Sequence, residues 1–172
     1  EISISLLHSF DPQLYQESRD LEVHIDDYED HLGTYMVQIS ARQLTDNDNR
    51  ILTQMMQSIG DLERISDHAY SIALSVREMY NKKIAFSEAA QNELAVQERA
   101  LQDLLDLTVK AFCEDDLELA ARVEPLEEVV DGLNDELRVR HVKRLQDGRC
   151  TLELGFIFND LLTGMERIAD HC

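Results

Sequence analysis

The sequence contains no tryptophan, two prolines, six glycines and only 6% aromatic residues among its 172 positions. β-Sandwiches and barrels need frequent turn residues and strands rich in aromatic and β-branched side chains, and collagen-like chains need periodic glycine. These scarcities argue against all three classes. No segment alternates polar and apolar residues for long enough to predict a strand. Because 44% of the residues are nevertheless hydrophobic, we expect an all-α fold with a buried core.

Basic residues are also scarce, since 16 lysines and arginines face 35 aspartates and glutamates, which gives a net charge of −19. Neutralising a nucleic-acid backbone requires a basic surface, and so does a polybasic membrane anchor. No run of about 18 apolar residues predicts a membrane span, and the first residues lack the positive region of a signal peptide. We therefore expect a soluble cytoplasmic protein that does not bind nucleic acid.

Two further motifs are missing. The three cysteines, at positions 113, 150 and 172, form no CxxC pair, so reduced thiols are expected. No Glu-x-x-His occurs, which argues against a ferritin-like di-iron oxidase.

Apolar residues recur at three-, four- and seven-residue steps, the period of an amphipathic helix. Asp11 followed by Pro12 predicts the start of the first of five main helices, and Thr151 caps the last. The fourth predicted helix continues through Pro125, which we expect to bend it. The predicted helices cover residues 12–44, 51–83, 87–114, 117–145 and 152–168.

The chain contains an internal repeat. Residues 21–32 align without a gap on 126–137 with five of twelve positions identical, and residues 62–68 align on 165–171 with five of seven identical. We therefore predict two repeated units, residues 1–83 and 84–172. The second unit begins with a whole helix, whereas the first has only the segment SLLHSF in its place, so the first bundle looks truncated.

A Glu-x-x-x-Asp motif occurs four times, always at equivalent places in the repeat. Residues four apart share a helix face, so two motifs on neighbouring helices can direct four carboxylates to one point. Oxygen ligands suit hard cations, which would relieve the repulsion between like charges; an acidic solvated face is the alternative. The candidate metal ligands are Glu22, Asp26, Glu63, Asp67, Glu127, Asp131, Glu166 and Asp170.

Four neighbouring residues also repeat but stay outside the predicted ligand set. Asp30 and Asp135 lie one helical turn beyond the motifs and are expected at the solvated surface. His68 and His171 directly follow the last aspartate of each unit, about 100° around the helix, and so point elsewhere.

The segments DLERISDHAYSIA (61–73) and GMERIADHC (164–172) resemble the PhoU family. The final segment, 143–172, is most similar to the PhoU-like C-terminal domain of bacterial Na/Pi-cotransporter proteins. The resemblance implies two tandem three-helix bundles and metal clusters held by the acidic motifs. It also implies a cytoplasmic role in phosphate uptake or its control, with iron, manganese, magnesium, zinc or calcium as the bound ion.

Three functions compete at this point. The resemblance favours a metal-binding regulatory domain of a sodium-dependent phosphate transporter, whose partner is the membrane-embedded part of the same protein and whose further ligand is phosphate. The alternative is a stand-alone PhoU regulator that acts with an ABC phosphate transporter and a sensor kinase. A metal-dependent phosphohydrolase is the third, but the sequence offers no nucleophile constellation and no separate general base, so we expect no enzymatic activity.

The truncated first bundle predicts self-association. Its missing helix would leave an apolar stripe of Leu52, Met56, Ile59 and Leu62 without cover, and large apolar patches usually find a partner. We therefore expect the protein to form a homodimer or to swap helices. Light scattering that shows a monomer at high concentration would contradict this prediction.

Overall fold

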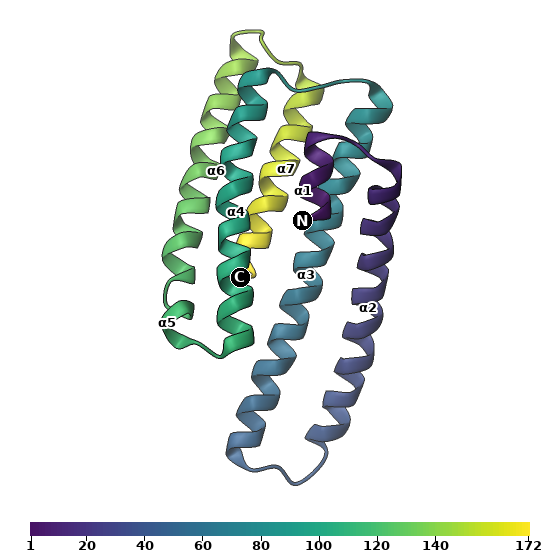
Figure 1. The fold of residues 1–172 in the computed structure, drawn as a ribbon, viewed down its shortest axis with the longest axis vertical. Coiled ribbons are helices and arrows are strands. Elements are labelled where there is room, and N and C mark those ends of the chain that lie inside the picture. Colours follow the sequence, from purple (N-terminus) through teal and green to yellow (C-terminus); the bar gives the residue numbers. More distant parts are fainter.

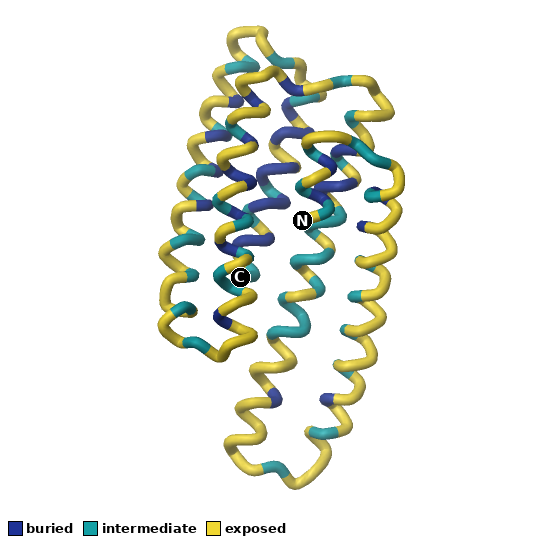
Figure 2. Tube along the Cα trace, in the orientation of Figure 1, coloured by how far each residue is buried: buried dark blue, intermediate teal, exposed yellow.

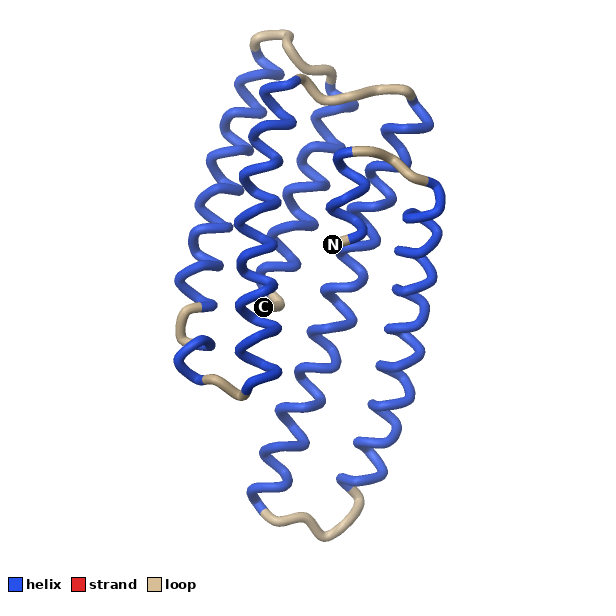
Figure 3. The backbone as a smooth tube through the Cα atoms, in the orientation of Figure 1, coloured by secondary structure: helices blue, strands red, loops and turns tan.

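A computed structural model describes all 172 residues as seven helices joined by short turns, with no strand (Figure 3). The prediction of an all-α fold is confirmed. None of these helices has the length and apolar character needed to cross a bilayer. The helices are α1 (Ile2–His8), α2 (Pro12–Ser40), α3 (Asp46–Lys82), α4 (Glu88–Glu114), α5 (Leu117–Ala120), α6 (Val123–Gln146) and α7 (Leu152–Asp170).

Polar side chains determine where the long helices begin. The Asp11 carboxylate accepts hydrogen bonds from the backbone N–H groups at the start of α2, and Pro12 follows at the first helical position. Thr45 and Asp48 form a reciprocal capping box at the start of α3. Thr151 caps α7 as the sequence predicted, by accepting a hydrogen bond from Leu154 N–H.

The predicted single helix over 117–145 is wrong, because the chain breaks at Ala121 and Arg122 and forms the one-turn α5 and the longer α6. Proline inside a helix loses the hydrogen bond to the residue four positions earlier and clashes with that carbonyl. With the break at Ala121 and Arg122, Pro125 falls in the first turn of α6, where the backbone N–H has no helical partner anyway. The break thus replaces the expected bend.

The helices form two groups that meet along α3 and α7 (Figure 1). In the first group α2 and α3 pack as a long antiparallel hairpin, and the short α1 contacts both near one end. In the second, α4, α6 and α7 all pack against one another. The lower ends of α2 and α3 project beyond the rest of the molecule. This arrangement agrees with tandem three-helix bundles whose first member has only a short first helix.

The two groups share one hydrophobic core. A cluster of 15 buried residues draws on α4, α6 and α7 and also includes Ile72 from α3. A smaller cluster of Leu6, Tyr15, Ala73 and Val76 holds α1 between α2 and α3. Burial is therefore concentrated where α3 and α7 meet and fades toward the projecting hairpin tip (Figure 2).

The apolar stripe of the first group is only partly exposed. Met56 and Leu62 are exposed, as predicted, but Leu52 is buried and Ile59 is half-buried, so the expectation for Leu52 is wrong. Leu52 lies in the second turn of α3, near the turn that joins α2 to α3. Next to α1, an open groove of about 630 Å³ runs between α2 and α3. Self-association stays a prediction, and we expect it to occur through this groove.

The contact between α3 and α7 generates a stability prediction. A Cβ atom added to Gly164 of α7 would lie 3.1 Å from Cγ1 of Ile72 and 3.7 Å from the carbonyl oxygen of His68. Gly164→Val therefore overfills a packed contact, and we expect a loss of about 2 kcal/mol of unfolding free energy in urea denaturation. Gly132→Val is the matched control, because a Cβ atom there meets nothing within 4 Å. Equal losses in the two variants would contradict the assigned packing.

Candidate metal centres

The first acidic cluster joins α2 to α3. Glu22 and Asp26 lie one turn apart on α2, and Asp67 approaches them from α3. One carboxylate oxygen of each residue lies within 4.8 Å of the other two. Glu22 is half-buried and both aspartates are exposed, so the cluster is open to solvent and to an incoming ion. We call these three residues triad one.

Glu63 lies beside triad one rather than within it. It lies one turn before Asp67 on the same face of α3 and forms no ion pair with a basic side chain. That spacing makes Glu63 a candidate fourth oxygen donor to a cation in triad one.

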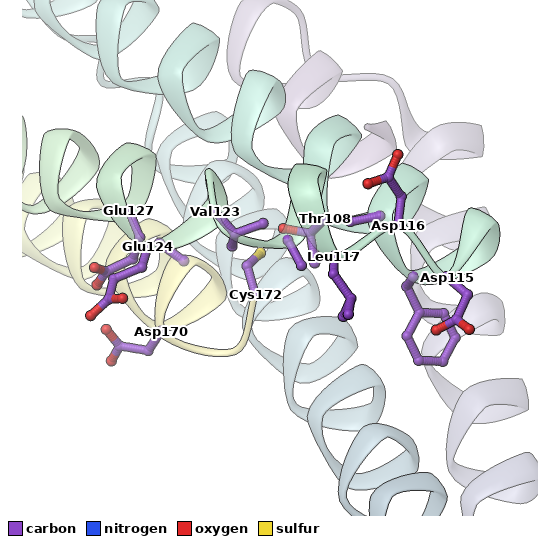
Figure 4. Close-up of a pocket in the computed structure, with 13 residues that line it drawn as sticks. Thr108, Asp115, Asp116, Leu117, Val123, Glu124, Glu127, Asp170 and Cys172 are labelled. Atoms are coloured by element: carbon purple, nitrogen blue, oxygen red, sulfur yellow. The ribbon is translucent and has the colours of Figure 1, made fainter.

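The second cluster is the repeat equivalent and joins α6 to α7. Glu127 and Asp131 of α6 and Asp170 of α7 place carboxylate oxygens within 4.8 Å of one another. Figure 4 shows the Glu127 and Asp170 side chains directed toward the same open region, with Glu124 beside them. A pocket of about 610 Å³ adjoins them. We call Glu127, Asp131 and Asp170 triad two.

Glu166, the remaining predicted ligand, is held by Arg138, which also contacts Thr163. Arg138 of α6 donates a hydrogen bond from Nη2 to Glu166 Oε2 at 2.6 Å, and another to Thr163 Oγ1 at 3.1 Å. Six of the eight predicted ligands thus converge in two triads, Glu63 adjoins one of them, and Glu166 is engaged in an ion pair. Sequence reasoning missed Arg138 and Thr163.

The carboxylates of triad one repel one another. Burial raises the pKa of Glu22, and the negative charges of Asp26 and Asp67 raise it further. Burial also raises the pKa of Glu63, and the charge of Asp67 raises it further. The charge of Arg19 lowers the pKa of Glu22 by less than burial and the aspartates raise it, so proton binding is favoured here.

Triad two shows the same repulsion. Burial raises the pKa of Asp131, and the charges of Glu166 and Asp170 add to that effect. Burial, then the charges of Asp131 and Asp170, raise the pKa of Glu127. Part of the charge of Asp170 is balanced by Arg167, whose Nη1 lies 3.1 Å from Asp170 Oδ2 in an exposed pair.

The donor set of both triads fits a hard multivalent cation. Each triad offers carboxylate oxygens only, the ligands preferred by magnesium, calcium and manganese and accepted by ferric iron. Oδ1 of Asp131 is buried and has no hydrogen-bond partner, which leaves an acceptor without a donor in triad two. A cation would satisfy that oxygen and neutralise several charges at once.

The repeated histidines connect the two groups of helices instead of joining a triad. The rings of His68 and His171 stack with centroids 6.1 Å apart, and His171 Nδ1 lies 3.1 Å from Asp61 Oδ1. His68 and Asp61 belong to the middle of α3 and His171 follows α7, so these contacts link the C-terminal end of α7 to the middle of α3. The expectation that both histidines lie outside the ligand set agrees with this arrangement.

Comparison with known proteins places this geometry in a family. The PhoU domain model matches residues 1–76 and 98–172, which is most of the chain. The chain belongs to the PhoU domain family. The resemblance seen in the acidic segments is thereby confirmed at the level of the family; the closer similarity to Na/Pi-cotransporter proteins finds no support among the relatives below.

Two related proteins match about three quarters of this chain. The chain is 29% identical over 143 residues to the phosphate-specific transport system accessory protein PhoU homolog 1 of Thermotoga maritima, across 78% of this chain and 60% of that protein. It is also 29% identical over 136 residues to an uncharacterized protein of Deinococcus radiodurans, across 76% of this chain and 47% of that protein. The chain thus spans about half to three fifths of the length of these relatives.

Two solved structures share the PhoU fold. PhoU from Pseudomonas aeruginosa superposes with a TM-score of 0.89 at 24% identity, over 99% of this chain and 81% of that one. The phosphate transport system regulatory protein PhoU from Streptococcus pneumoniae gives a TM-score of 0.83 at 19% identity, over 99% and 79% of the two chains. The helical architecture described above is therefore that of PhoU proteins.

The raised pKa values of this PhoU domain predict how its stability depends on pH. A carboxyl group whose pKa is raised by folding binds more protons when folded, so metal-free stability falls as the pH rises above the ordinary carboxyl range. Asp131→Asn removes one repelling charge, so we expect a higher melting temperature for the metal-free variant at pH 7. The difference should shrink as the pH falls through the raised pKa of Asp131, because the wild-type group then loses its charge as well.

The control for this melting experiment is Asp147→Asn, because Asp147 pairs with Arg149 in the turn before α7, away from both triads. A metal-free Asp131→Asn protein that melts below the wild type at pH 7 would contradict the repulsion in triad two.

Proposed function

We propose that this protein is a stand-alone PhoU-type regulator of phosphate transport that works with an ABC phosphate transporter and a sensor kinase. The observation that carries the proposal is the PhoU domain match over most of the chain, together with a relative named as an accessory protein of a phosphate-specific transport system. That relative supports the stand-alone alternative over the domain of a sodium-dependent transporter, which was the first reading of the sequence.

The two triads give the proposed regulator its metal sites. Glu22 and Asp26 of α2 with Asp67 of α3 would hold one cation, and Glu127 and Asp131 of α6 with Asp170 of α7 the other. A bound cation supplies positive charge that several carboxylates share. Each triad spans two helices, so these residues would couple metal loading to the relative position of the helices that carry them.

Regulation, rather than hydrolysis, is the activity that the residues support. The pocket beside triad two contains the thiol of Cys172, but burial raises the pKa of that thiol and its Sγ donates a hydrogen bond to the carbonyl of Ile168. A protonated, hydrogen-bonded thiol is a poor nucleophile. The two histidines that follow the motifs, His68 and His171, stack on each other, and His171 also contacts Asp61.

The regulator would act at the cytoplasmic face of the membrane, where the nucleotide-binding part of an ABC transporter lies. Its strongly acidic composition suits a protein partner with basic surface residues better than a lipid surface. Metal loading would then alter the affinity for that partner through the difference in binding to the loaded and metal-free states.

A paired binding and uptake experiment tests this function. We expect Mn²⁺ to raise the melting temperature of the wild type by mass action and a chelator to reverse the rise. In cells that lack their own regulator, the wild-type gene should restore repression of phosphate uptake, and the double variant Asp67→Asn/Asp170→Asn should not. Asp30→Asn/Asp135→Asn is the matched control, since both aspartates are repeated and exposed but lie outside the triads.

Three results would overturn parts of the proposal. Restoration by the double variant would separate regulation from the triads. No restoration by the wild type would argue against the regulatory role. Metal-dependent hydrolysis of a phosphate ester that Asp170→Asn abolishes would instead support the phosphohydrolase.

A further inference from the structure

The two triads differ in the residues that surround them. Alignment of the two repeat units identifies the positions that differ. In the register that aligns 126–137 with 21–32, Arg138 falls opposite Gly33. In the register that aligns 165–171 with 62–68, Thr163 falls opposite Gly60. Arg138, which contacts Glu166, and Thr163, which contacts Arg138, therefore each have a glycine at the equivalent position in the first unit.

The consequence in the second unit is an anchored glutamate. Arg138 Nη2 lies 2.6 Å from Glu166 Oε2 and also donates to Thr163 Oγ1, so the guanidinium is held by two neighbouring groups of α7. The Arg138 and Glu166 side chains are 34% and 29% exposed, which limits screening by water. Moving Glu166 to a cation in triad two requires breaking a charge-assisted hydrogen bond.

In the first unit the equivalent glutamate has no such anchor. Glu63 lies one turn from Asp67, itself a member of triad one, and forms no ion pair with a basic side chain. Gly33 and Gly60 carry no side chain that could take the place of Arg138 and Thr163, and a Cβ atom added at either glycine would meet nothing within 4 Å. No ion pair therefore has to break before Glu63 joins Asp67 on a cation.

Arg167 does not account for this difference. It contacts Asp170 at 3.1 Å, but its repeat equivalent, Arg64, is also an arginine and lies 3.7 Å from Asp61. Both arginines are exposed by more than half, and exposed pairs contribute little. Arg138 has no counterpart of any charge.

We propose that Arg138 is a positioning residue that makes the two metal sites unequal: by holding Glu166 away from triad two, it leaves three carboxylates there, against four in the first site. The first site, with Glu63, fills at low cation concentration, and the second fills only at higher concentration. This inference rests on the proposed metal binding by the triads. The two sites therefore differ in use. The first is always occupied, and the second is occupied only when the cation concentration is high.

Calorimetric titration of the metal-free protein with Mn²⁺ tests the proposal. We expect two binding steps in the wild type, with Asp67→Asn removing the tighter step and Asp170→Asn the weaker one. Arg138→Gln should tighten the weaker step by about tenfold, since changing a group that orients a ligand alters metal affinity by about 10- to 100-fold. The tighter step should stay unchanged in this variant.

The repeat supplies the converse experiment. Gly33→Arg with Gly60→Thr rebuilds the anchor around Glu63, and a Cβ atom at either position meets nothing within 4 Å. We expect this double variant to weaken the tighter step by about tenfold. Arg149→Gln is the control for a lost positive charge, because Arg149 pairs with Asp147 in the turn before α7 and should leave both steps unchanged.

The outcomes separate the inference from the function on which it rests. Two equal binding steps in the wild type, or an Arg138→Gln titration that matches the wild type while the variant melts cooperatively, would overturn the role of Arg138 and leave metal binding intact. No Mn²⁺ binding at either site would overturn both proposals. A tenfold change in Arg149→Gln as well would show that net charge alone acts, and would also overturn the positioning role.

Discussion

The packing of α3 against α7 is the contact on which the rest of this molecule depends. Ile72 of α3 lies within the core that α4, α6 and α7 build, and Gly164 lets α7 approach it closely. Each of these two helices also contributes one aspartate to an acidic triad. The same contact therefore holds the two helical groups together and sets the position of both candidate metal centres.

The two acidic triads lower the stability of the fold. Carboxylates brought together by helix packing repel one another, and burial strengthens the repulsion, as the raised pKa values of Glu22 and Asp131 indicate. The hydrophobic core has to overcome this cost when no cation is present. A site that costs stability when empty and recovers it when occupied couples metal supply to the conformation of the helices, which is the property a regulator needs.

The internal repeat explains both the likeness of the two sites and their difference. Equivalent motifs create equivalent triads because the helix pairs pack in the same way. The flanking positions are not constrained by that packing, so Gly33 and Gly60 in one unit stand where Arg138 and Thr163 occur in the other. Comparison of the two units at these positions could have identified the anchor of Glu166 from the sequence, once the register of the repeat was known.

The sequence by itself determined the all-α class, the repeat, most helix ends and the spacing of the acidic motifs. These features follow from local rules, such as capping by Asp11 and Thr151 and the 3.6-residue period of the apolar stripes. Only the tertiary structure decided that the chain breaks before Pro125, that Leu52 is buried and that Glu166 pairs with Arg138. The break before Pro125 depends on the balance of backbone hydrogen bonds. The burial of Leu52 and the pairing of Glu166 depend on residues that are distant in the chain. Spacing along one helix places a carboxylate on a face, but the neighbouring helix decides whether other carboxylates or an arginine lie beside it.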